Sequence, residues 1–125
     1  MQTWNIPSVV ALFVLADGVL IVKPKDTHVM AGHRATLNCS TSLTEGVHWY
    51  HDTTYIYAGR KLYSPYDSKL KIEVFQHDGT TAFNLVFPST KPEDAGTYIC
   101  GDMQGRGEKS SAEMNVFTAG TIVGL

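Results

Sequence analysis

The segment Asp94-Ala95-Gly96-Thr97-Tyr98-Ile99-Cys100 constrains the fold of this chain more than any other stretch. It ends on one of only two cysteines, and the other, Cys39, lies far upstream. Trp49 stands between the two cysteines, and Tyr98 precedes the second by two positions. Because residues two apart on a strand point to the same side, we expect Tyr98 and Cys100 to share an inward face.

A sandwich of two antiparallel sheets accounts for this pattern. The inward side chains of such sheets meet across about 10 Å. One disulfide between Cys39 and Cys100 can cross that gap, with the indole of Trp49 filling the space beside the sulfurs. A bridge across so long a loop destabilises the unfolded chain by about 4 kcal/mol. It also fits an oxidising compartment, which predicts a secreted or cell-surface protein.

The composition is that of an ordinary globular protein. The chain has 125 residues, a net charge of −2, 43% hydrophobic residues and 18% charged residues. Its length predicts one domain. The charge balance argues against a nucleic-acid partner and against a disordered chain.

Both ends of the chain are expected to lie outside the domain, which we place at residues 19–118. Residues 1–18 contain a nearly unbroken apolar run that is too short to span a bilayer and typical of a signal peptide. No Lys or Arg precedes that run, and a retained apolar segment is the alternative. The apolar residues 119–125 are predicted to be a linker or the beginning of a membrane span.

Several segments have the alternation and β-branched composition of strands. They lie at residues 19–22, 34–39, 47–51, 55–57, 81–87, 97–103 and 110–116, and a further strand begins at residue 71. Between residues 57 and 69 the sequence is compatible with either an extra edge strand or a loop. The period of two places Leu37 and Leu85 inward, and with Trp49 and Tyr98 they form the predicted core.

Asn38-Cys39-Ser40 matches the acceptor pattern for N-glycosylation. A cysteine in the middle position and the predicted strand at 34–39 both disfavour modification. Asn38 is therefore a candidate glycosylation site, with an unmodified strand residue as the alternative.

The pattern as a whole resembles the immunoglobulin superfamily over about residues 19–117. The resemblance is carried by the Cys…Trp…Cys order and by the segment that ends at Cys100. It implies an all-β, immunoglobulin-like Greek-key sandwich of two sheets, of the variable or intermediate set (V-set or I-set). Residues 71–100 are similar to the D-E-F region of a variable-type domain, and this similarity implies that Lys71 pairs with Asp94.

The end of the domain differs from antigen-receptor variable domains. Phe117-Thr118-Ala119-Gly120-Thr121 is similar to the joining pattern FGxGT, but Thr118 stands in place of the first glycine. Asp52 stands where a paired antibody domain has Gln. The resemblance therefore implies an adhesion or receptor module rather than half of an antibody-like pair.

No catalytic residue, cofactor or metal site is predicted. Both cysteines are assigned to the bridge, and the five histidines fall on different strands and turns. His48 and His51 have a spacing of three, which places them on opposite faces of a strand. We therefore predict that the protein is not an enzyme.

An outward surface is the remaining candidate for function. Because Trp49 and Cys100 face inward, Tyr50 and Ile99 must face outward, and burying that pair contributes about 3 kcal/mol by area. Contiguous exposed apolar patches mark contact sites. Other residues predicted to extend this patch are Met103, Tyr55 and Tyr57, or alternatively Ile56.

These features predict an extracellular recognition module that binds a protein partner, or a second copy of itself, through the sheet face of the predicted strands at 47–51, 55–57, 97–103 and 110–116 (C, C′, F and G in the superfamily). The superfamily usually docks through this face. The alternative is a soluble immune binder of a microbial or glycan ligand, acting through the loops at 42–46 and 104–109. A structural spacer is a third reading. Membrane attachment is expected only if a span follows Leu125.

Overall fold

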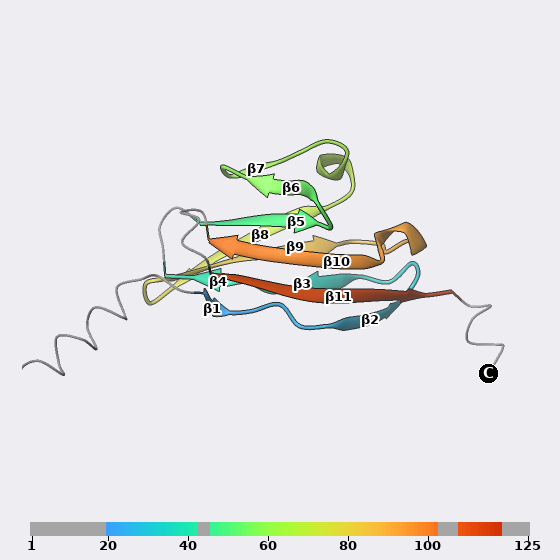
Figure 1. Ribbon diagram of the computed structural model, residues 1–125, viewed down its shortest axis with the longest axis horizontal. Helices are drawn as coiled ribbons and strands as arrows, with labels where there is room; N and C mark the ends of the chain where they lie inside the picture. The colour runs from blue at the N-terminus through green and yellow to red at the C-terminus, as the bar shows by residue number, and fades with distance from the viewer. Residues whose placement is uncertain (1–19, 43–45, 103–107, 119–125) are drawn as a thin grey trace, which may run out of the picture.

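The computed structural model describes residues 20–42, 46–102 and 108–118, which form two facing β-sheets (Figure 1). The five-stranded sheet contains β1 (Leu20–Val22), β4 (Ser40–Thr41), β9 (Thr80–Phe87) and β3 (Ala35–Leu37) in that order, with β8 (Lys71–His77) also paired to β9. The six-stranded sheet has the order β2 (Thr27–Met30), β11 (Lys109–Phe117), β10 (Gly96–Asp102), β5 (Val47–His51), β6 (Thr54–Ala58) and β7 (Lys61–Leu62). The predicted all-β sandwich is confirmed.

The N-terminal strand region crosses from one sheet to the other. β1 pairs with β4 in the five-stranded sheet, whereas β2 runs parallel to β11 in the six-stranded sheet. Pro24 lies between them and lacks the N–H group that a continuous strand would use in pairing. β2 was not predicted, because its residues show no alternation of strongly apolar and polar side chains.

Between residues 57 and 69 the sequence was compatible with an extra edge strand or a loop, and the structure contains both a short strand and irregular chain. β7 adds a short edge strand beside β6, and the single-turn helix η1 (Tyr66–Ser68) follows it. A second such turn, η2 (Pro92–Asp94), precedes β10.

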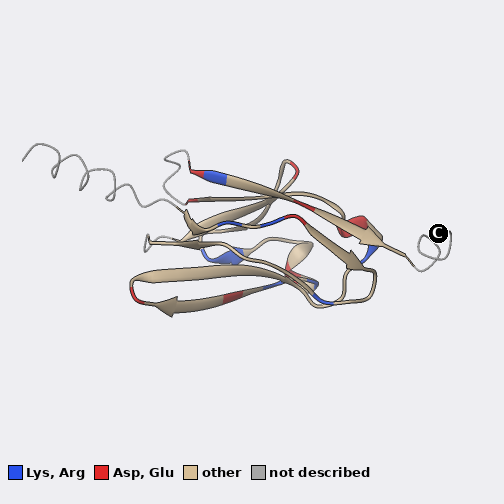
Figure 2. Ribbon diagram, turned by 90° about the horizontal axis from the view of Figure 1, so that it is seen from below, with Lys and Arg blue, Asp and Glu red and all other residues tan. Residues whose placement is uncertain are grey.

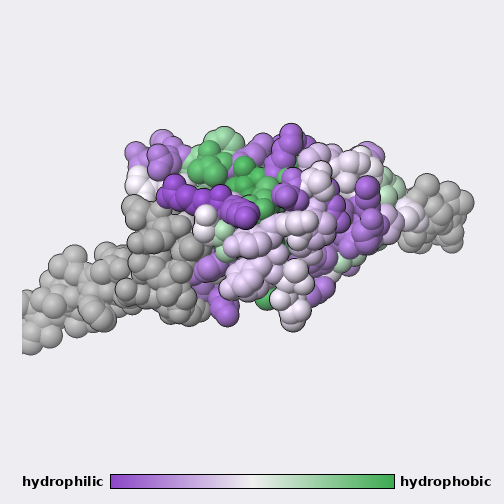
Figure 3. All heavy atoms as spheres, turned by 90° about the horizontal axis from the view of Figure 1, so that it is seen from above, coloured by the Kyte–Doolittle hydropathy of each residue, from purple (hydrophilic) through white to green (hydrophobic). Residues whose placement is uncertain are grey.

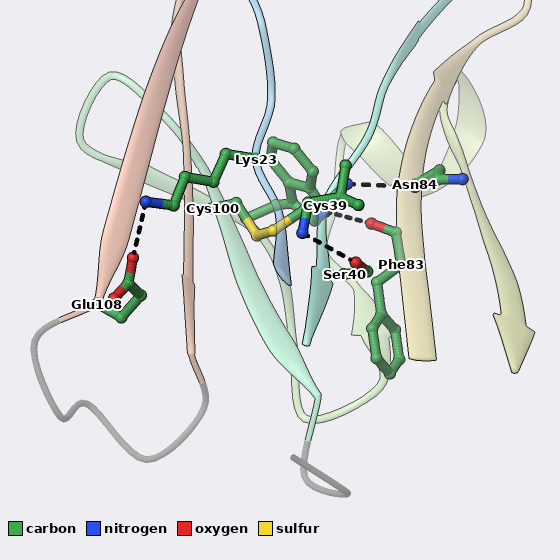
Figure 4. The surroundings of a disulfide bond; sticks show 9 residues. Lys23, Cys39, Ser40, Phe83, Asn84, Cys100 and Glu108 are labelled. Carbon is green, nitrogen blue, oxygen red and sulfur yellow. Dashed lines mark hydrogen bonds and ion pairs between the residues drawn. A yellow bond between two sulfur atoms is a disulfide. The ribbon is translucent and has the colours of Figure 1, made fainter. Parts of the chain in front are cut away.

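The core lies between the sheets and is organised around Trp49. Its Nε1 donates a hydrogen bond to the carbonyl oxygen of Phe83 at 2.9 Å, which joins the two sheets. Cys39 and Cys100 form the disulfide beside it, with a separation of 2.00 Å between their sulfurs (Figure 4). Leu37, Leu85 and Tyr98, the other predicted core residues, are almost fully buried.

Tyr98 closes the corner that leads into β10. Its hydroxyl donates to the carbonyl oxygen of Asp94 at 2.5 Å. Gly96 has a φ of +143°, and a Cβ at this position would lie 2.7 Å from Nε2 of His51. The corner therefore requires glycine for both conformation and space.

The prediction that Lys71 pairs with Asp94 is wrong. Nζ of Lys69 lies 4.0 Å from Oδ1 of Asp94, while Lys71 is an exposed residue of β8 whose partner across the ladder is Val86. Lys69 follows η1 directly and precedes the ladder, so its side chain reaches toward η2. The second carboxylate oxygen of Asp94 accepts a hydrogen bond from the Lys91 N–H at 2.8 Å.

Charged residues of both signs are interspersed along the strands and turns of the described structure (Figure 2). Two ion pairs connect neighbouring parts of the surface, between Lys23 and Glu108 at 3.3 Å and between Arg34 and Glu73 at 3.0 Å. Exposed pairs of this kind contribute little to stability, which leaves the core and the disulfide as the main sources.

Candidate docking face

Four aromatic side chains gather on the outward face of the six-stranded sheet, and we call them the aromatic cluster. β5 supplies His48 and Tyr50, β6 supplies Tyr55, and Tyr63 follows β7. The rings of Tyr50 and Tyr55 stack with centroids 4.7 Å apart, and those of Tyr55 and Tyr63 lie 6.4 Å apart. Tyr55 and Tyr63 are 46% and 42% exposed, so the cluster presents aromatic surface to solvent.

The strand register places Ile99 beside this cluster. Ile99 of β10 is directly opposite Tyr50 of β5, and Tyr50 is in turn opposite Tyr55 of β6. On its other side, Ile99 faces Ser111 of β11. Ser111, Ile99, Tyr50 and Tyr55 therefore form one row across four strands, and we call this row together with the aromatic cluster the docking face.

A register shift between β5 and β6 determines which residues belong to the docking face. Trp49 pairs with Tyr57, whereas Tyr50 pairs with Tyr55, so Ile56 is an extra residue in β6. Both Ile56 and Tyr57 consequently turn inward, and Tyr57 is only 6% exposed. The expectation that Tyr57 or Ile56 contributes to the patch is wrong, because a bulge interrupts the period of two.

The hydroxyl groups of the docking face form a short polar link over the stacked rings. The Tyr50 hydroxyl donates to the Tyr55 hydroxyl, with 3.4 Å between the oxygens. This hydrogen bond, with burial and the repulsion of an ionised Tyr55, raises the pKa of Tyr50 to about 12. At the margin, Nζ of Lys61 lies 5.5 Å from the ring centroid of Tyr63, within the range of a cation–π contact.

Two members of the aromatic cluster were not predicted. His48 has the same outward parity as Tyr50, so the period of two could have identified it. Its Nδ1 is buried and has no hydrogen-bond partner among the described residues. Tyr63 lies between residues 57 and 69, where the sequence shows no alternation and is compatible with either a strand or a loop.

Seen from above, the described surface carries a compact hydrophobic area among hydrophilic and near-neutral side chains (Figure 3). Aromatic rings that carry one polar group are suited to contacts that are partly dry and partly hydrogen-bonded.

Other predicted features lie partly or wholly outside the described residues. These are Met103, most of the loops at 42–46 and 104–109, and the terminal segments 1–18 and 119–125. Within residues 20–42, 46–102 and 108–118, no group of three or more His, Cys, Asp or Glu side chains could hold a metal ion. In the same ranges there is no helix of the length and hydropathy needed to cross a membrane.

Known proteins share this architecture. A chain in the titin M10–obscurin-like 1 Ig complex is 23% identical, covers 81% of this chain and 94% of its own length, and has a TM-score of 0.61. The RIG-5 IG1 homodimer is 14% identical over 79% of this chain and 96% of that chain, with a TM-score of 0.68. Dpr1 IG1 bound to DIP-eta IG1 is 16% identical over 80% of this chain and 95% of that chain, with a TM-score of 0.63.

No curated protein matches the chain. The model of the immunoglobulin domain family matches residues 25–101, which include both cysteines, Trp49 and the Tyr98 corner. The chain therefore belongs to the immunoglobulin domain family and is a non-enzymatic module.

Proposed function

We propose that this protein is an extracellular recognition module of the adhesion or receptor type that binds a protein partner through the docking face, with self-association as the first case to test. The observation that carries the proposal is the row of Ile99, Tyr50 and Tyr55, continued by Tyr63. Contiguous apolar surface marks interaction sites, and tyrosine is enriched among the residues that dominate binding energy.

Three further features support this proposal. The disulfide between Cys39 and Cys100 is of the kind that persists in oxidising compartments. Tyr50 and Tyr55 of the docking face lie on paired strands, which hold their rings in fixed positions and lower the entropy lost on binding. Similar folds occur in complexes of two Ig domains and in a homodimer.

Sedimentation velocity over a range of concentrations tests self-association. We expect the wild-type chain to dimerise and Ile99→Asp to shift the equilibrium to monomer, because a charge would be buried in the contact. Tyr55→Ser should weaken the dimer by removing a stacked ring. Val74→Ser is the control, since Val74 is an apolar residue, 52% exposed, on β8 of the other sheet.

A monomeric wild type would exclude self-association and shift the test to other partners. The chain would then be tetramerised through a tag and screened against cell-surface and secreted proteins. Binding that is lost in Ile99→Asp and kept in Val74→Ser supports the docking face. Binding that both variants retain equally would assign recognition to another part of the molecule.

A further inference from the structure

A second exposed apolar surface lies on the outward side of the five-stranded sheet, away from the docking face. Strand pairing there aligns Phe75 with Ala82, Ala82 with Ser40, and Ser40 with Val22. These residues line a shallow pocket of about 260 Å³, which Asn38 and other polar side chains complete. We call it the β9 pocket.

The walls of the β9 pocket are two large apolar side chains that the rest of the protein covers only in part. Phe75 is 57% exposed and Val22 is 45% exposed. Between them the row contains only the small side chains of Ala82 and Ser40, which form a low floor. A phenyl ring exposed to this extent beside a second apolar side chain is favourable to cover.

Asn38 is one of the residues that line the pocket, and it begins a modification motif. It is the only asparagine of the chain that is followed two positions later by Ser or Thr. The structure places it in the break between β3 and β4, where it is exposed, and not within a strand as the sequence suggested. The acceptor residue of a glycosylation motif therefore stands at the margin of an uncovered aromatic pocket.

We propose that Asn38 carries an N-linked glycan and that its first N-acetylglucosamine packs in the β9 pocket against Phe75 and Val22. The amide nitrogen of Asn38 forms a bond to C1 of the sugar, and the bond between C1 and the lipid-linked diphosphate donor breaks. The electron pair leaves with the diphosphate, and the amide proton passes to base. The proposal rests on the proposed function only in that the chain must enter the secretory pathway.

The chemistry of the pocket suits a pyranose ring. One face of the sugar presents C–H groups, which pack on the electron-rich face of the Phe75 ring. Its edge presents hydroxyl and acetamido groups, which need polar neighbours. Asn84 and Thr80 supply such groups around the same pocket.

The folded structure also determines when this modification takes place. Ser40 is almost fully buried, and its Oγ accepts a hydrogen bond from the Val22 N–H at 3.1 Å. Cys39, the middle residue of the motif, is in the disulfide. Because Ser40 and Cys39 are inaccessible once β1 covers β4, the sugar must be transferred before the sheet closes and before the bridge forms.

The first test is the intact mass of the full chain secreted from eukaryotic cells. We expect a mass above that of the polypeptide, which a peptide N-glycosidase removes and which Asn38→Gln lacks. Asn38→Gln changes an exposed side chain, so loss of folding does not confound it. Asn115→Gln is the matched control and should keep the added mass.

The glycosylated fraction at Asn38 should also depend on how early the disulfide forms. A reductant that delays the Cys39–Cys100 bridge during synthesis should increase the glycosylated fraction, as should Ser40→Thr. A secreted wild type with the bare polypeptide mass would overturn this proposal and leave the docking face untouched. A chain that stays in the cytosol in these cells would overturn both this proposal and the extracellular function.

The second test separates packing from mere attachment. Glycan trimmed to one N-acetylglucosamine should keep the contact, so that form should melt about 4 °C above Asn38→Gln. In a Phe75→Ser background the difference should disappear, whereas Val74→Ser, one position along β8 with its side chain on the other face, should preserve it. Equal melting temperatures of the trimmed and unglycosylated forms would show that the sugar does not occupy the pocket.

Discussion

The Tyr50 hydroxyl has one intramolecular acceptor in the docking face, and that contact governs its chemistry. It donates to Tyr55, which stabilises the neutral form and raises the pKa of Tyr50 to about 12. The Tyr50 ring therefore stays uncharged throughout the physiological pH range. A neutral aromatic surface can be covered by a partner without the cost of burying a charge.

Tyr55→Phe is expected to lower the pKa of Tyr50 toward its ordinary value near 10, because the acceptor and the charge of ionised Tyr55 are both removed. A pH titration of the ring carbon shifts by NMR measures the change. Tyr63→Phe, which alters a neighbouring ring without touching the hydrogen bond, should leave the pKa of Tyr50 near 12. A pKa that is the same in wild type and Tyr55→Phe would refute the assignment.

The sign of the effect on stability follows from the raised pKa. Below pH 10, Tyr50 is protonated in both the folded and the unfolded chain, so its contribution is constant. Between about pH 10 and 12 only the unfolded chain ionises, and the free energy of unfolding falls. In this range Tyr50→Phe should lose stability with pH less steeply than the wild type, as measured by urea unfolding.

Tyr98→Phe is expected to reduce the free energy of unfolding by about 1–2 kcal/mol, because the buried carbonyl oxygen of Asp94 loses its donor. Burial, followed by the charge of Asp94, raises the pKa of Tyr98, so this hydroxyl remains a donor in alkaline solution. Urea unfolding measures the loss. Tyr63→Phe, at an exposed hydroxyl, should change stability by less than about 0.5 kcal/mol.

At the scale of the strands, local alternation was enough to predict most elements and most of the core. Leu37 and Leu85 were identified from the alternation of their strands, and Trp49 and Tyr98 from their positions relative to the two cysteines. The bulge in β6 was not predictable, because it depends on how β6 pairs with β5 and not on its own sequence. This bulge is why Tyr57 turned out to be buried.

The β8–β9 hairpin depends on a turn with positive φ angles, +50° at Asp78 and +77° at Gly79. Gly79→Ala is expected to destabilise the protein by about 1 kcal/mol, because only the backbone conformation opposes it and a Cβ would meet no neighbour within 4 Å. Asp78→Gly, which relieves the same constraint one residue earlier, should be neutral or stabilising. Equal effects of the two substitutions in urea unfolding would contradict this account.

The contact between Lys69 and Asp94 joins the segment before β8 to η2. Lys69→Met should destabilise the protein by less than about 1 kcal/mol, because the pair is long and the lysine is partly exposed. Lys71→Met should have no measurable effect. A double-mutant cycle with Asp94→Asn isolates the pair, and coupling to Lys71 instead of Lys69 would contradict the observed geometry.

At the scale of the whole molecule, the sequence was sufficient to predict the sandwich and its disulfide, because those depend on a few residues with fixed spacing. The passage of the N-terminal strand from one sheet to the other was not predicted. Its pairing partner, β11, lies at the far end of the sequence, and the segment Thr27–Met30 carries no pattern that indicates it.

The disulfide should contribute most to global stability. Cys100→Ser is expected to lower the free energy of unfolding by about 4 kcal/mol, since the bridge closes a loop with a sequence separation of 61. Urea unfolding of the variant, and of the wild type with and without reductant, measures the loss. An unchanged melting temperature would show that the bridge does not restrain the unfolded chain.

The side-by-side arrangement of β2 and β11 has a mechanical consequence. β1 begins at one end of the long axis and β11 ends at the other (Figure 1). A force that pulls these two ends apart would slide β2 along its parallel neighbour, so that the rungs from Thr27–Met114 to Met30–Phe117 would bear the load together. After rupture, the covalent link from Cys39 to Cys100 would allow extension only of the residues before the first cysteine and after the second.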